Sequence, residues 1–176
     1  MFRTRRILVL LAALLALGAV FAFTEVQIEG AAGWAAGLPT WRIDRHPLLD
    51  LVWGGRPLTG YHLGIFLFMF LVFHLVFAFH GRFSRRLEAR AIGALMVFWI
   101  VEDFLWFVMN PAFGLAKFNP AGVPWHRHWW LGVPSDYLIF VPIGCLLIAY
   151  SFRRAAPRAP AGAAGPEAVA TRGGES

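Results

Sequence analysis

The stretch AIGALMVFWIVEDFLWFVMN, residues 91–110, is an apolar run of the length that crosses a lipid bilayer as a helix. The hydrocarbon core of a bilayer requires about 20 consecutive, mostly apolar residues in α-helical form. Three further apolar blocks occupy residues 7–24, 61–79 and 137–152. The sequence therefore predicts an all-α integral membrane protein with four transmembrane helices in an up-down bundle.

The composition predicts one membrane domain and no separate soluble domain. Hydrophobic residues make up 59% of the 176 residues and charged residues only 15%, whereas soluble domains carry about 25% charged residues. We expect the transmembrane domain to cover residues 1–154. Residues 155–176 are rich in Ala, Pro and Gly, which is typical of a disordered tail, here a cytoplasmic one. The only cysteine is Cys145, so no intrachain disulfide can form.

The positions of the arginines predict which loops face the cytoplasm. Arginines precede the first block, separate the second from the third and follow the fourth, while the two longer connections hold fewer basic residues. Cytoplasmic loops carry an excess of Arg and Lys, so we expect both termini in the cytoplasm. The abundance of Arg, Ala and Gly beside almost no Lys favours a bacterial cytoplasmic membrane. The formal charge of +6 follows from this topology and predicts no nucleic-acid partner.

The first block admits two interpretations. It is longer than the apolar region of a usual signal peptide and ends without a clear small-residue cleavage site, which favours an uncleaved anchor. Cleavage would leave three spans with the same sidedness.

Tryptophans are concentrated on the predicted external side. Seven of the eight fall in the two long connections or at the outer end of the third span: Trp34, Trp41, Trp53, Trp106, Trp125, Trp129 and Trp130. Indole rings favour the headgroup zone, but an interfacial belt normally appears on both sides of a membrane. We expect an aromatic-rich cap over the outer end of the bundle, with a one-sided belt as the alternative.

Two adjacent acids, Glu102 and Asp103, interrupt the third span. An ionised carboxylate facing lipid costs several kcal/mol, and acids within spans commonly mark functional sites. Adjacent helical positions differ by about 100°, so the two side chains cannot share one direction. Most other unusual polar residues also belong to the outer half: Glu25, Glu29, His62, His126, His128 and Asp136. The pattern predicts an outward-opening polar cavity between the helices. The structural alternative is hydrogen bonding between helices or an ion pair with an arginine of the cap.

The segment WHRHWW, residues 125–130, supplies two histidines at i, i+2 spacing. In an extended segment this spacing places both imidazoles on one side. His126 and His128 with Glu102 would then form a His₂-carboxylate set of the kind that holds zinc or ferrous iron, with His62 as a further ligand. Packing and headgroup contacts are the alternative role for the two loop histidines.

Two functions from different classes fit these residues, and whether the protein is an enzyme is left open. In the first, Glu102, His126 and His128, with His62 as a further ligand, hold a divalent metal that supports hydrolysis or redox chemistry on a lipophilic substrate or is itself carried as cargo. Asp103 then acts as the catalytic proton acceptor or orients a metal ligand. In the second, the protein is a non-enzymatic membrane subunit whose buried polar groups are structural and whose aromatic cap docks a membrane protein partner. Ion or proton permeation is a third alternative.

Overall fold

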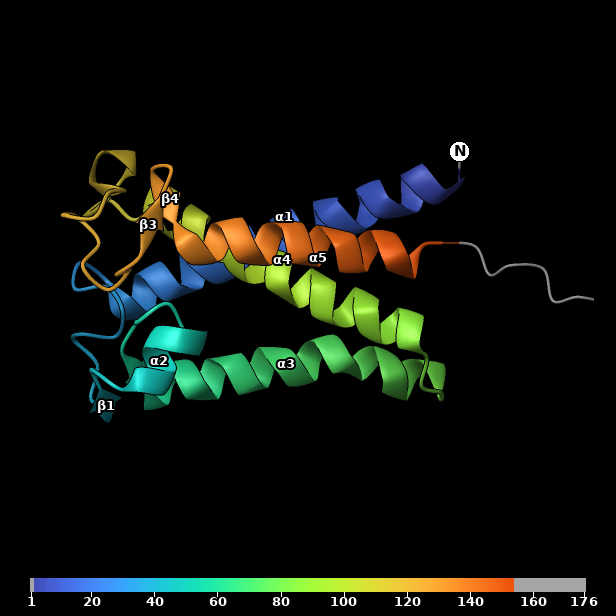
Figure 1. Ribbon diagram of the computed structural model, residues 1–176, viewed down its shortest axis with the longest axis horizontal. Helices are drawn as coiled ribbons and strands as arrows, with labels where there is room; N and C mark the ends of the chain where they lie inside the picture. The colour runs from blue at the N-terminus through green and yellow to red at the C-terminus, as the bar shows by residue number, and fades with distance from the viewer. Residues whose placement is uncertain (1, 154–176) are drawn as a thin grey trace, which may run out of the picture.

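The computed structural model describes residues 2–153, and this part of the chain contains four long helices joined by short elements (Figure 1). The elements in chain order are α1 (Phe2–Glu29), β1 (Arg42–Ile43), α2 (Pro47–Val52), β2 (Leu58–Thr59), α3 (Gly60–His80), α4 (Arg85–Met109), η1 (Leu115–Lys117), β3 (Trp129–Trp130), β4 (Val133–Pro134) and α5 (Ser135–Ser151). The predicted tail, residues 155–176, lies outside the described residues.

Among the described residues, three helices are long and apolar enough to cross a membrane, namely Thr4–Glu29, Gly60–His80 and Arg85–Met109. The prediction of a mostly helical chain with long apolar helices is therefore confirmed. The fourth helix, α5, is apolar but has only 17 residues. At 1.5 Å per residue it is roughly 26 Å long, somewhat less than the hydrocarbon thickness of about 30 Å.

Two helices extend beyond the apolar blocks of the sequence. Helix α1 continues to Glu29, and α4 begins at Arg85, six residues before the apolar run at residue 91. Hydropathy marks only the part of a helix that suits lipid, whereas the backbone hydrogen bonding continues into the polar flanks. The early start of α4 also brings Glu88 within 3.3 Å of the Nε2 atom of His74 on α3.

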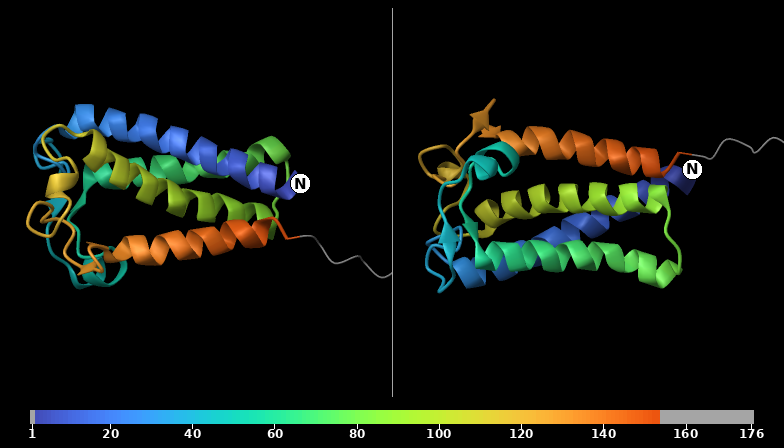
Figure 2. Two further views of the ribbon diagram at one scale, coloured as in Figure 1. Left: turned by 90° about the horizontal axis from the view of Figure 1, so that it is seen from above. Right: turned by 60° about the horizontal axis from the view of Figure 1, so that its bottom comes forward.

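Helix α4 is the centre of the bundle, because α1, α3 and α5 each pack against it (Figures 1 and 2). Glycines permit the closest of these approaches. A Cβ atom on Gly93 would lie 2.7 Å from the carbonyl oxygen of Gly144, and one on Gly144 would lie 2.9 Å from that of Gly93. Small residues let helix backbones approach closely in membranes, where packing drives association. The fully buried Phe98 and Phe107 of α4 belong to the two hydrophobic clusters beside it.

Residues 30–59 and 110–134, which we call the cap, lie together at one end of the bundle, opposite the N-terminus and the end of α5 (Figure 1). Two short antiparallel pairs order the cap. Strand β1 pairs with β2, and β3 pairs with β4. Thr59 at the end of the first segment caps α3 by accepting a hydrogen bond from the backbone N–H of His62. Asn110 joins α4 to the end of α1 by donating to the carbonyl oxygen of Gly30 at 2.8 Å.

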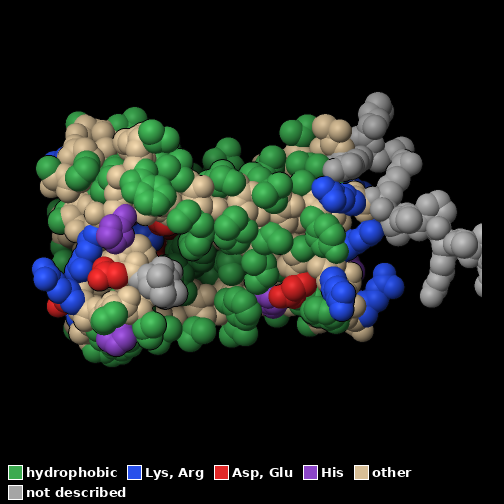
Figure 3. All heavy atoms as spheres, viewed as in Figure 1, with side chains coloured by type: hydrophobic (Ala, Val, Ile, Leu, Met, Phe, Trp, Pro, Cys, Tyr) green, Lys and Arg blue, Asp and Glu red, His purple; other side chains and the backbone are tan. Residues whose placement is uncertain are grey.

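Apolar side chains cover the middle of the face shown in Figure 3, with basic side chains toward both ends. Many large hydrophobic residues of the long helices are exposed, among them Val20 at 66%, Leu71 at 64% and Leu146 at 69%. Such an exposed apolar band is compatible with a lipid surround.

Candidate functional site

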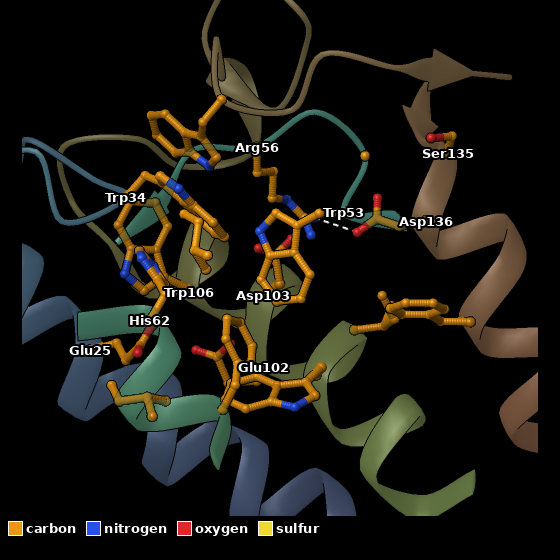
Figure 4. A pocket seen from close by; sticks show the side chains of 18 of the residues that line it. Glu25, Trp34, Trp53, Arg56, His62, Glu102, Asp103, Trp106, Ser135 and Asp136 are labelled. Atoms are coloured by element: carbon orange, nitrogen blue, oxygen red, sulfur yellow. Dashed lines mark hydrogen bonds and ion pairs between the residues drawn. The ribbon is translucent and has the colours of Figure 1, made fainter. Parts of the chain in front are cut away.

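A cavity of about 790 Å³ lies where α3, α4 and α5 meet the cap (Figure 4). Its volume falls within the range of about 300–1,000 Å³ that small-molecule sites occupy. Aromatic and aliphatic side chains form most of its wall, including Trp53, Phe66 and Trp99. Two groups of polar residues also contribute to it, together with the separate side chains of Asp50, Glu102 and His128. The arrangement is that of a largely apolar pocket with a few polar groups at one end.

The first polar group, which we call the Asp103 cluster, joins two helices to both cap segments. Asp103 of α4 lies 3.3 Å from the Nε2 atom of His126 and accepts a hydrogen bond from the hydroxyl of Tyr137. The Nη2 atom of Arg56 lies 2.9 Å from the Nδ1 atom of His126. The same guanidinium pairs with Asp136 (Figure 4). The His126 side chain is only 1% exposed, and those of Arg56 and Asp136 are 11% and 14% exposed. The cluster is therefore a mostly buried network in which an imidazole and a guanidinium lie between two carboxylates.

The second polar group, which we call the His62 cluster, joins α1 to α3. The Tyr61 hydroxyl donates to Oε1 of Glu25 at 3.1 Å, and Nε2 of His62 lies 3.5 Å from Oε1 of Glu29. The other imidazole nitrogen, Nδ1, lies 2.8 Å from the hydroxyl of Thr59. Glu25, Glu29 and His62 are all buried. The i, i+4 spacing places both glutamates on one face of α1, where they meet consecutive residues of α3.

The first cap segment connects the two clusters through Trp34. This indole stacks on the His62 ring with centroids 3.9 Å apart, and the guanidinium of Arg56 lies over it at 5.3 Å. Trp34 and Ala35 have φ angles of 44° and 52°, in the left-handed region that L-residues rarely occupy. The backbone N–H of Ala35 donates to Glu29 at 2.6 Å. That carboxylate therefore stabilises the unusual turn that carries Trp34 to the site.

Four buried side-chain atoms have no hydrogen-bond partner among the described residues, and all four residues line this cavity. The atoms are Nε1 of Trp53, Nε of Arg56, Oε1 of Glu102 and Nε1 of Trp106. A buried polar group without a partner costs about 1–3 kcal/mol, so each one requires an explanation. All four belong to residues of one cavity wall, so a polar group bound in the cavity is a candidate partner for them.

The predicted acids both belong to the cavity wall, although they are neighbours on one helix. Glu102 is 4% exposed, and Asp103 points toward the cap. The two predicted histidines of the loop, His126 and His128, differ in their surroundings. His126 contacts Asp103 and Arg56, while His128 lines the cavity from an exposed position two residues away. The intervening segment is not helical, but one imidazole is buried and the other is not.

The four residues proposed as metal ligands are not brought together. His62 contacts Glu29 and Thr59, His126 contacts the Asp103 cluster, and Glu102 has an unpaired oxygen. Within the described residues, no three His, Cys, Asp or Glu side chains are placed to share a metal ion. The geometry resembles more closely the structural alternative, in which imidazoles, carboxylates and an arginine of the cap satisfy one another.

Sequence reasoning did not identify Arg56, Tyr61 or Tyr137 as site residues. Arg56 lies in an external connection with few basic residues, and each tyrosine is the first residue of an apolar block. Asp136, one of the polar residues predicted in the outer half, lies in the first turn of α5. A useful signal was available, because buried acids require donors and Arg56, Tyr61 and Tyr137 are donors near the predicted outer ends of the spans.

Comparison of the chain with protein-family models, curated proteins and solved structures found no match.

Proposed function

We propose that this chain is a small integral membrane protein with four transmembrane helices, both termini in the cytoplasm and the cap on the outer side. In this proposal its cavity binds a lipophilic molecule that enters from the bilayer. The arginines at the start of α1 and around the turn between α3 and α4 support the orientation, because they lie at the end of the bundle opposite the cap. The 17 residues of α5 suffice for a span if the flanking residues adapt to a slightly thinner bilayer.

The main support for a bound ligand is the set of four unpaired polar atoms on one cavity. If the polar residues of the site were purely structural, they would be expected to satisfy one another, as His126 and Asp103 do at 3.3 Å. Glu102, Trp53, Trp106 and Arg56 instead keep unpaired atoms in the wall of the same 790 Å³ cavity. This observation favours ligand binding over the alternative of a membrane subunit whose polar groups are only structural.

Lateral access is supported by the apolar part of the cavity wall. The wall extends along α3 through Leu63, Leu67 and Phe70, which are 41%, 55% and 42% exposed. Across the cavity, Ile139 of α5 is 45% exposed. The space-filling view is hollowed between these two helices (Figure 3). An apolar opening at this level would face acyl chains, so the expected ligand has an apolar body and a polar head.

A pair of isoleucines on α5 allows this proposal to be tested. Ile139 lines the cavity and Ile143, one turn farther along the helix, does not, yet the two are 45% and 44% exposed. Purified wild type, Ile139→Trp and Ile143→Trp would be incubated with a membrane lipid extract in an amine-oxide detergent and analysed by native mass spectrometry. We expect wild type and Ile143→Trp to retain a defined lipophilic adduct and Ile139→Trp to lose it.

Two outcomes would contradict the proposed binding site. Adducts of equal abundance in all three proteins, or their absence from all three, would show that the cavity is not the binding site of a lipophilic molecule.

A further inference from the structure

We infer that the cavity recognises an uncharged head group bearing hydroxyl or carbonyl oxygens, and that it discriminates against both anionic and cationic amphiphiles. The inference rests on the proposed function and specifies the ligand class of that site. It is drawn from the hydrogen-bonding capacity and charge of the cavity wall.

The unpaired donors require acceptor atoms in the ligand. Three of the four unpaired groups are N–H donors, from Trp53, Arg56 and Trp106. Indole and guanidinium nitrogens donate and do not accept. A head group without acceptor lone pairs, such as an alkylammonium, would leave all three unsatisfied in a buried site. Oxygen atoms in the head group would satisfy them.

The fourth group is the carboxyl of Glu102, which also needs a hydrogen-bond partner in the ligand. A hydroxyl both donates and accepts, so it pairs with the carboxyl of Glu102 in either protonation state. A carbonyl oxygen pairs with it when the carboxyl is protonated. Both are neutral groups, so the acid at the base of the cavity is compatible with an uncharged head.

The charge of the wall disfavours an anionic head group. Six carboxylate side chains line the cavity: Glu25, Glu29, Asp50, Glu102, Asp103 and Asp136. The only arginine in its wall is Arg56, and that guanidinium already pairs with Asp136. A phosphate or fatty-acid carboxylate would lose its hydration in a site whose acids outnumber its bases. Donors and charge together therefore select a neutral, oxygen-bearing head.

The test uses three photoreactive amphiphiles that share one 12-carbon chain carrying a diazirine. Their heads are glycerol linked by an ether, phosphate, and trimethylammonium. Full-length protein in phosphatidylcholine nanodiscs would be illuminated with each probe, and labelling of cavity-lining peptides would be quantified by mass spectrometry. We expect the glycerol probe to label the cavity at least tenfold more than either charged probe, and Ile139→Trp to abolish that labelling.

Three Trp→Phe variants test whether the unpaired indole N–H groups contribute to binding of the glycerol probe. Trp53→Phe and Trp106→Phe each remove one unpaired N–H, and a neutral hydrogen bond corresponds to roughly a two- to tenfold change in affinity. We expect each variant to lower labelling by the glycerol probe by that factor. Trp41→Phe is the matched control, because Trp41 also belongs to the cap but does not line the cavity and is 51% exposed. Labelling in this control should change less than twofold.

The outcomes distinguish the two levels of the proposal. Equal cavity labelling by the three probes, a preference for a charged head, or equal losses in all three tryptophan variants would overturn the inference about the head group and leave the lipophilic site standing. The absence of cavity labelling by every probe would remove the proposed function itself.

Discussion

Arg56 illustrates how one side chain can organise a site in this protein. It comes from a Gly- and Pro-rich part of the cap, and it contacts Asp136, His126 and the ring of Trp34. A guanidinium presents five donors in a fixed plane, so it can bind several partners at once. Its positive charge helps to explain why the Asp103 cluster can hold two carboxylates in a largely apolar bundle.

The buried pair between Arg56 and Asp136 should contribute strongly to stability. We predict that Asp136→Asn lowers the free energy of unfolding by roughly 3–5 kcal/mol, because it leaves a buried guanidinium without its counter-charge. Asp44→Asn is the control: Asp44 is 68% exposed and pairs with Arg42 at 3.0 Å, so its loss should cost less than about 1 kcal/mol. Unfolding of both variants in detergent, followed by tryptophan fluorescence, measures the difference. Similar small losses would contradict the description of the Asp103 cluster as a structural network.

The metal content of the protein tests the alternative hypothesis, in which Glu102 and the histidines bind a divalent metal. The guanidinium of Arg56 lies 2.9 Å from His126 Nδ1, where its positive charge opposes a divalent cation, and His62 is engaged by Glu29. We therefore predict that elemental analysis finds equal zinc and iron content in wild type, Glu102→Gln and His126→Ala. Stoichiometric metal in the wild type that both variants lose would restore the proposed metal site and require the cap to rearrange around it.

At the level of helices, α4 has two roles. It packs against three neighbours, and it carries Glu102 and Asp103 into the cavity wall. Gly93 lies in its inner half and allows α5 to approach, while Phe98 and Trp106 fill the outer half. The packing of α4 against its neighbours therefore fixes the positions of Glu102 and Asp103 in the cavity wall.

The crossing of α4 and α5 should be the most sensitive contact between helices. We predict that Gly93→Val lowers the free energy of unfolding by about 1–3 kcal/mol, because the added atoms would clash with the backbone of α5. Gly64→Val is the matched control, since Gly64 also lies within a long helix but has no atom within 4 Å of an added Cβ. That variant should be neutral or slightly stabilising, because valine has the better helix propensity. Thermal unfolding of both proteins in the same detergent gives the comparison, and equal losses would contradict the close crossing.

At the level of the whole molecule, the two ends of the bundle are chemically different. One end carries the cap and the cavity, whereas the other carries the turn between α3 and α4 and the arginines around it. This asymmetry supports the proposed orientation in the membrane, since basic residues are retained on the cytoplasmic side.

Labelling of single cysteines tests that orientation. In a Cys145→Ser background, we predict that Ala121→Cys in the cap reacts with a membrane-impermeant maleimide on intact cells. Ser84→Cys, between α3 and α4, should react only after the membrane is permeabilised. Gel-shift or fluorescence detection gives the result, and the reverse pattern would overturn the orientation and place the cavity on the cytoplasmic side.

The long apolar helices could be located from the sequence because hydropathy is a local property. The block at residues 61–79 corresponds to α3 at Gly60–His80, with one residue of difference at each end. The early start of α4 at Arg85 was not found, because its first turns are polar. The gathering of Glu25, Glu29 and Glu102 in one cavity wall could be anticipated from their similar positions near the outer ends of the spans.

The specific pairings depended on contacts between distant parts of the chain. Arg56 and Asp136 are 80 residues apart, and Tyr137 meets Asp103 across 34 residues. Which imidazole meets which carboxylate follows from helix rotation and from the path of the cap, including the left-handed turn at Trp34. Helix rotation and the path of the cap both depend on packing across the whole bundle. The pattern of apolar and charged residues was therefore enough to predict long apolar helices and a polar outer half, whereas the fold was needed to show that the histidines pair with acids and that four polar atoms remain unpaired around one cavity.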